Sequence, residues 1–82
     1  MLEKEIKNKI VKIMELSLEI SNQKKYQVFA WYSGSIDGLE IFVKEKERNE
    51  FFFKKTVYLD WEEKYVLVEL NEVIKKLEEL NK

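Results

Sequence analysis

The fold is decided by the stretch from residue 26 to residue 59, which reads YQVFAWYSGSIDGLEIFVKEKERNEFFFKKTVYL. Aromatic and β-branched residues dominate this stretch, and these residue types favour strands. Asp37-Gly38 is typical of a two-residue hairpin, because a type I′ turn needs positive φ at both central positions. The polar run 46–49 indicates a second turn. We therefore expect three short antiparallel strands, at about 26–36, 39–45 and 50–59.

On both sides of this stretch, apolar residues recur at intervals of three and four, which is the period of an amphipathic helix. The pattern predicts helices at about 2–20 and 61–80. Asp60 and Glu63 have the spacing of a capping box, which favours the early start of the second helix. The alternative is a fourth strand at Tyr65-Val66-Leu67-Val68 and a shorter helix capped by Asn71.

The predicted fold class is therefore α+β, with a three-stranded antiparallel meander flanked by N- and C-terminal helices. Residues 1–82 form a single domain in this prediction, because no linker or repeat divides them. A chain of this size has a thin core and gains stability from a partner chain.

The composition excludes much of enzyme chemistry. The 82 residues include neither His nor Cys, and 15 Lys and Arg against 16 Asp and Glu give a net charge of −1. The commonest general base, the Cys–His and Ser–His nucleophile pairs and the usual structural zinc ligands are thus missing. We interpret Ser33 and Ser35 as strand-end and turn residues, Asp37 as a turn residue and Glu63 as a cap. We expect a non-enzymatic protein with no cofactor and no metal site.

The longest uninterrupted apolar run spans five residues, 28–32. A membrane-spanning helix needs about 20 apolar residues, and the apolar part of a signal peptide needs about 7–15. The sequence thus predicts neither kind of segment, and we expect a cytoplasmic protein with no membrane partner.

The pleat of the predicted sheet separates its residues into two faces. Pairing across Asp37-Gly38 makes facing residue numbers sum to 75, so even-numbered residues of the first strand share a face with odd-numbered residues of the second. One face is expected to carry both helices and consists of Val28, Ala30, Tyr32, Gly34, Ile36, Leu39, Ile41, Val43, Phe51, Phe53, Val57 and Leu59, with Lys55 as its charged member. The opposite face consists of Gln27, Phe29, Trp31, Ser33, Glu40, Phe42, Lys44, Phe52, Lys54, Thr56 and Tyr58.

The opposite face holds five aromatic residues, which form the candidate partner-binding site: Phe29, Trp31, Phe42, Phe52 and Tyr58. Fully burying such side chains stabilises a protein by roughly 1.5–3 kcal/mol each, so we expect something to cover them. Two interpretations stay open. In the structural one, a helix or a second copy of the sheet packs on this face; in the functional one, the face binds another protein.

The first helix has more apolar surface than one sheet needs. Val11, Met14 and Leu18 form a second stripe beside the main one, which predicts a contact with the second helix or with a dimer mate. Trp61, Tyr65 and Val68 likewise lie off the main stripe of the second helix. We therefore expect a homodimer or an obligate partner.

An aromatic sheet surface with lysines also resembles the stacking platforms of proteins that bind single-stranded nucleic acids. This is the alternative function. It is disfavoured here because such proteins carry a basic footprint, whereas this chain has a near-zero net charge and a single Arg, Arg48.

A family resemblance is carried by the segments Trp31-Tyr32-Ser33-Gly34, Leu39-Glu40-Ile41-Phe42-Val43, Val57-Tyr58-Leu59-Asp60 and Leu70-Asn71-Glu72-Val73-Ile74-Lys75-Lys76-Leu77. Over roughly residues 26 to 80 the chain resembles small uncharacterised proteins of bacteriophages and mobile elements. A His usually follows the Gly of that pattern, where this chain has Ser35. The resemblance implies a small accessory protein, of a class that includes inhibitors of host defences such as anti-CRISPR proteins. Such inhibitors commonly act by occluding a larger host protein.

Overall fold

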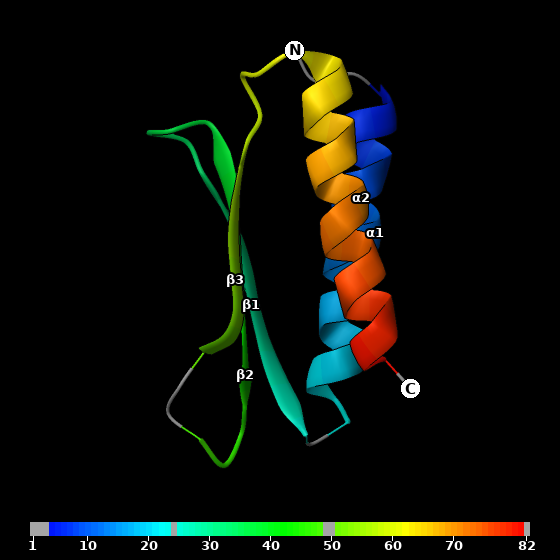
Figure 1. The fold of residues 1–82 in the computed structure, drawn as a ribbon, viewed down its shortest axis with the longest axis vertical. Helices are drawn as coiled ribbons and strands as arrows, with labels where there is room; N and C mark the ends of the chain where they lie inside the picture. The colour runs from blue at the N-terminus through cyan, green and yellow to red at the C-terminus, as the bar shows by residue number, and fades with distance from the viewer. Residues whose placement is uncertain (1–3, 24, 49–50, 82) are drawn as a thin grey trace.

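The computed structural model describes residues 4–23, 25–48 and 51–81. Its elements, in chain order, are α1 (Lys4–Ser21), β1 (Tyr26–Ser33), β2 (Gly38–Glu45), β3 (Phe51–Tyr58) and α2 (Glu63–Leu80). The strands form one antiparallel sheet with β2 in the centre. Figure 1 shows both helices side by side on the same side of this sheet. The predicted α-β-β-β-α meander is confirmed.

The observed bounds lie close to the predicted ones. Residues 65–68 are helical, so the alternative of a fourth strand is wrong. The predicted helix start at residue 2 and strand start at residue 50 lie outside the described residues.

The start of α2 differs from the prediction. Its N-cap is Glu62 rather than Asp60, and Glu62 makes no side-chain capping hydrogen bond. The predicted capping box is therefore wrong. The reason lies in the sheet: Leu59 N–H donates to the Asp37 carbonyl at 2.8 Å, so the chain is still held by the sheet one residue before Asp60.

The β1–β2 hairpin has a longer loop than predicted. Ser33 lies opposite Gly38, and facing residue numbers sum to 71 rather than 75, so residues 34–37 form a four-residue loop. Asp37 has a positive φ of 47°, whereas Gly38 has a negative φ and belongs to β2, so the predicted type I′ turn is wrong. The loop is stabilised by Tyr32 Oη, which donates to Asp37 Oδ1 at 2.8 Å.

The change of register is an even number, so the two faces of β1 and β2 are as predicted. Gly34 and Ile36, however, lie in the loop rather than on a strand. Ile36 and Tyr32 are exposed instead of contributing to the core, because the β1–β2 hairpin bends away from the helices at this end (Figure 1).

A β-bulge exchanges two phenylalanines between the faces. Val43 lies opposite Phe53 and Lys44 opposite Phe51, so Phe52 is the extra residue in β3. The ring of Phe52 lies on the helix side, 5.8 Å from the ring of Tyr26. The predicted faces of Phe51 and Phe52 are therefore wrong, since the prediction assumed regular alternation along β3.

The core lies between the sheet and the two helices. Its buried side chains are Ile6, Ile13, Leu16 and Ile20 of α1, Leu39, Ile41 and Val43 of β2, Val57 and Leu59 in and after β3, and Val66, Leu70, Val73 and Leu77 of α2. No residue of β1 belongs to this set; Val28 and Ala30 are only partly buried. The sheet is thus covered well over β2 and incompletely over β1.

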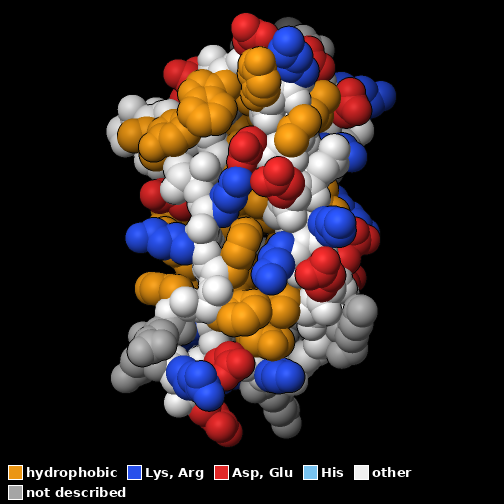
Figure 2. Space-filling model, in the orientation of Figure 1, with side chains coloured by type: hydrophobic (Ala, Val, Ile, Leu, Met, Phe, Trp, Pro, Cys, Tyr) orange, Lys and Arg blue, Asp and Glu red, His pale blue; other side chains and the backbone are white. Residues whose placement is uncertain are grey.

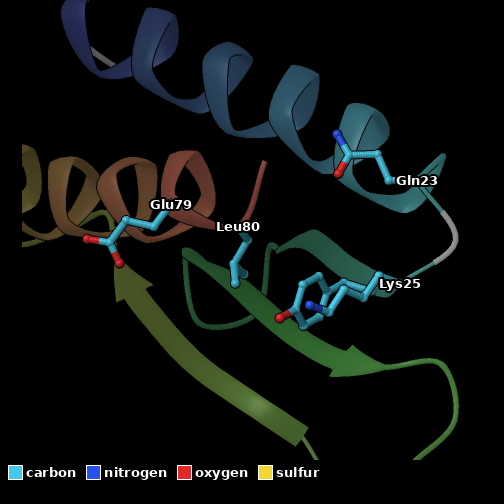
Figure 3. Close-up of a pocket in the computed structure, with 5 residues that line it drawn as sticks. Gln23, Lys25, Glu79 and Leu80 are labelled. Carbon is cyan, nitrogen blue, oxygen red and sulfur yellow. The ribbon is translucent and has the colours of Figure 1, made fainter. Parts of the chain in front are cut away.

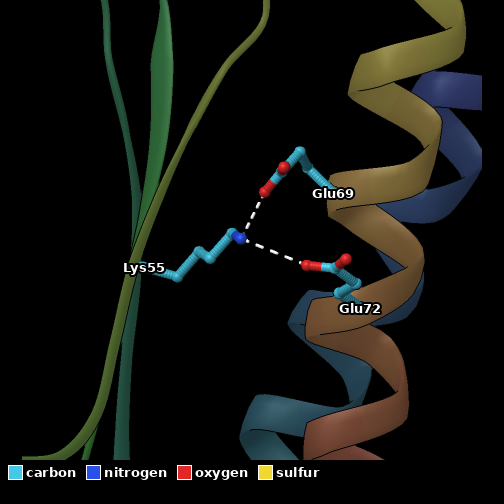
Figure 4. Close-up of polar contacts among 3 residues, drawn as sticks. All are labelled: Lys55, Glu69 and Glu72. Atoms are coloured by element: carbon cyan, nitrogen blue, oxygen red, sulfur yellow. Dashed lines mark hydrogen bonds and ion pairs between the residues drawn. The ribbon is translucent and has the colours of Figure 1, made fainter.

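Lys55 is the charged residue on the helix side of β3. Its Nζ lies 3.2 Å from Glu72 Oε2 and is also paired with Glu69, both on α2 (Figure 4). The hydrogen bond to Glu69 is the main cause of the raised pKa of Lys55. The pairs connect α2 to the outer strand of the sheet.

Candidate interaction surface

The side of the sheet opposite the helices carries no helix or strand of residues 4–23, 25–48 and 51–81 (Figure 1). Of the alternatives for covering this side, a helix is therefore wrong, whereas both helices lie on the other face as expected (Figure 1). Four aromatic residues form what we call the open aromatic face: Phe29, Trp31, Phe42 and Phe51. Trp31 is 45% exposed and Phe51 is 55% exposed.

The four rings contact one another. Phe42, on the central strand, has its ring centroid 4.9 Å from that of Trp31 and 5.3 Å from that of Phe51. Phe29 meets Phe51 edge to face, with centroids 6.5 Å apart. Such contacts restrict ring motion, so little rotamer entropy is lost when another molecule covers the rings.

Charged groups border the open aromatic face. Lys54 Nζ lies 5.3 Å from the centroid of the Phe42 ring, which is within the range of a cation–π contact. Glu40 lies opposite Trp31, and Lys44 lies opposite Phe51. The face therefore offers an apolar centre with two ammonium groups and one carboxylate around it.

Tyr58 lies apart from these four rings. It is opposite Gly38 at the end of the sheet, and its ring partner is Trp61, at a centroid distance of 5.4 Å. Figure 2 shows hydrophobic side chains gathered at this end, where β3 leads into α2.

Of the five predicted site residues, Phe29, Trp31 and Phe42 lie together as predicted. Tyr58 lies at one end, and Phe52 is on the other face.

The second stripe of α1 faces away from α2. Val11 is 54% exposed and Leu18 is 69% exposed, so the predicted contact of these two residues with the second helix is wrong. Met14 packs partly against the core. Met14 and Leu18 line a hollow of about 280 Å³ between α1 and β1, together with Ser17, Ser21, Val28 and Ala30.

Another hollow lies where the C-terminal end of α2 approaches the start of β1 (Figure 3). It has a volume of about 460 Å³, and its lining residues are Gln23, Lys25, Tyr26, Glu79 and Leu80. Figure 3 shows Lys25 and Glu79 on opposite sides of it, so the two charges do not converge on one point. Across residues 4–23, 25–48 and 51–81, no three acidic side chains gather as metal ligands would.

Among the described residues, neither α1 (Lys4–Ser21) nor α2 (Glu63–Leu80) is long and apolar enough to cross a membrane. In comparison with known proteins, the chain matches no family model, and no curated protein or solved structure is significantly similar to it.

Proposed function

We propose that the protein is a non-enzymatic binding module whose open aromatic face docks on another protein. The observation that carries this proposal is that Trp31 and Phe51 are about half exposed on the sheet, although α1 and α2 both lie on its other side (Figure 1). Aromatic residues dominate the energetics of protein interfaces, and a single buried Trp contributes about 2 kcal/mol or more. The partner has an apolar patch, with carboxylates placed to meet Lys44 and Lys54.

The partner in this proposal is a host defence protein, such as a CRISPR effector, which the chain inhibits by occupying its surface. This part rests on the sequence resemblance to small proteins of bacteriophages and mobile elements. Its test is a cleavage assay with purified CRISPR nucleases, in which the protein in molar excess slows cleavage at least tenfold.

The docking surface is tested with Phe51→Asp, which places a carboxylate on the open aromatic face. Tyr65→Asp is the matched control, because Tyr65 is also about half exposed but lies on α2. Each immobilised variant is exposed to the same bacterial lysate, and the retained proteins are quantified by mass spectrometry. A protein retained by wild type and Tyr65→Asp, but at least tenfold less by Phe51→Asp, is the expected result. Equal losses with both variants, or with neither, would overturn the proposal.

A second candidate function is the binding of single-stranded nucleic acid, favoured by the position of Lys54 over the ring of Phe42. Its probe is a fluorescein-labelled mixed-sequence oligonucleotide, titrated with protein at low and at physiological salt. Affinity that falls steeply with salt and is lost in Phe42→Ala supports this function. A flat titration at low salt excludes it.

A further inference from the structure

The outer edge of β1 carries backbone groups that pair with no strand of residues 4–23, 25–48 and 51–81. Val28 N–H donates to Ser21 Oγ at 3.1 Å, so the backbone of Val28 points away from β2. Backbone direction alternates along a strand, and Ala30 and Tyr32 therefore point the same way. Among the described residues, the backbone groups of these two residues make no hydrogen bond. Such an edge is a template for another strand.

The apolar stripe of α1 lies beside this edge. At 100° per residue, Val11 and Leu18 share one side of the helix, about 140–160° away from the buried Leu16. Leu18 lines the same hollow as Val28 and Ala30, which places the stripe above the edge of β1. The sheet layer and the helix layer therefore end on the same side of the molecule, the first in an unpaired strand edge and the second in an exposed apolar stripe.

We infer that a second copy of the chain occupies this side, with β1 against β1 and α1 against α1 around a twofold axis. A strand edge is complementary to itself in antiparallel pairing, as a twofold interface requires. The two three-stranded sheets join into one six-stranded sheet, with the helices in a continuous layer on one side. The inference goes beyond the proposed function, because it uses the edge of the sheet and places the open aromatic faces of the two copies next to each other on the side away from the helices.

The hydrogen bond between Val28 and Ser21 sets the register of this pairing. Since Val28 N–H already has a partner, Ala30 pairs with Tyr32 of the second copy and Tyr32 pairs with its Ala30. Each pair exchanges two backbone hydrogen bonds. Trp31 then lies opposite Trp31 of the second copy, as a non-hydrogen-bonded pair with Cα atoms about 4.5 Å apart.

The helix layer supports the same axis. From Val28 to Trp31 the strand rises about 10 Å, which equals the rise of six to seven residues of α-helix. Val28 is level with Ser21, and α1 runs antiparallel to β1, so Trp31 is level with Met14. One axis therefore passes Trp31 in the sheet layer and Met14 in the helix layer.

At this axis Val11 lies opposite Leu18 of the second copy, so the two exposed side chains of the stripe cover each other. In this register residues 29–33 of the two β1 strands lie opposite each other over about 16 Å, and the contact between the two α1 helices, about 10 Å away in the helix layer, adds to it. Such an interface is smaller than the roughly 1,200–2,000 Å² of stable complexes and falls among the weak, transient ones. We therefore expect a dimer that dissociates on dilution.

The register is tested by introducing one cysteine at a time. The chain contains no natural cysteine, so any disulfide between two copies must involve the introduced residue. In a glutathione redox buffer, Trp31→Cys forms a disulfide-linked dimer, in which two thiols are oxidised by glutathione disulfide. Two controls stay monomeric on non-reducing gels: Phe42→Cys, on the open face of the central strand, and Trp61→Cys, which is exposed elsewhere. Linkage through Phe42→Cys would show that open faces stack on each other, and linkage through none or all three would show no such pairing. Each of these results overturns the inference.

The edge is tested by Ala30→Pro, which removes an outward N–H that the β1–β2 ladder does not use. Thr56→Pro is the matched control on the free edge of β3, where Leu59 N–H bonding to Asp37 shows that even-numbered residues point outward. Light scattering well above micromolar concentration gives dimers for wild type and Thr56→Pro and a halved mass for Ala30→Pro. A monomeric wild type, or an unchanged mass for folded Ala30→Pro, overturns the inference.

If Ala30→Pro does not fold, Leu18→Asp decides, because Leu18 is exposed and its substitution leaves the core intact. The expected mass is again that of a monomer. Phe51→Asp keeps the dimer mass, so the failure of the dimer and the failure of the proposed function give different results.

Discussion

Lys55 shows how a charged side chain is accommodated on the core side of the sheet. Its raised pKa has the hydrogen bond to Glu69 as its largest cause; partial burial opposes this effect, and Glu72 adds to it. The pKa of Lys55 is higher in the folded protein than in the unfolded chain, where it is near 10.5. The stabilisation that the charged Lys55 side chain provides is therefore complete at pH values below 10.5, and it is lost as pH rises through the pKa of the folded state.

We predict that Lys55→Met lowers the free energy of unfolding by about 0.5–1 kcal/mol at neutral pH, and that its difference from wild type shrinks above the folded pKa. Urea unfolding of both proteins at neutral pH and at high pH measures this. The hydrogen bond to Asp37 also raises the pKa of Tyr32. Because Tyr32 is present in both proteins, its effect on the pH dependence cancels in the difference between them. Lys75→Met, at an exposed position of α2, is the control. A difference that stays constant with pH contradicts the prediction.

At the scale of elements, α2 begins without a side-chain cap. Glu62 has φ −57° and ψ 139°, which suits an N-cap residue, but its side chain makes no capping hydrogen bond. We predict that Glu62→Ser raises the free energy of unfolding by about 1 kcal/mol, because a Ser hydroxyl accepts from a free N–H of the first turn. Urea unfolding measures the change. Glu63→Ser, one residue inside the helix, is the control and brings no gain; equal effects would refute the capping argument.

The helices and strands follow from the sequence because each has a long, regular apolar period. The hairpin loop does not, because it depends on contacts with residues outside it: Tyr32 Oη and Leu59 N–H both bond to Asp37. A two-residue turn at Asp37-Gly38 agrees with the turn preference of the Asp-Gly sequence, but it would not form these two hydrogen bonds.

The candidate site was predictable as far as the strands are regular. Phe29, Trp31 and Phe42 follow from alternation along β1 and β2. The faces of Phe51 and Phe52 could not be predicted in this way. Residues 51–53 are all phenylalanine, so the hydrophobic pattern does not indicate which of them forms the bulge.

At the scale of the whole molecule, the sheet has one covered and one uncovered side, and substitutions should reflect this. Ile41 is fully buried on the helix side, and Phe51 is 55% exposed on the other. We predict that Ile41→Ala lowers the free energy of unfolding by about 2–5 kcal/mol, and that Phe51→Ala lowers it by at most about 1.5 kcal/mol. Chemical denaturation decides the matter. Comparable losses would mean that the open aromatic face is covered in the folded protein.

The bulge in β3 also bears on how the length of this chain can vary. Because Phe52 has no partner of its own on β2, its removal leaves Phe51 opposite Lys44 and Phe53 opposite Val43. A deletion of one residue here turns no other side chain to the opposite face, whereas a deletion elsewhere in a strand inverts every side chain beyond it. Related chains one residue shorter at this point can therefore keep both the core and the open aromatic face.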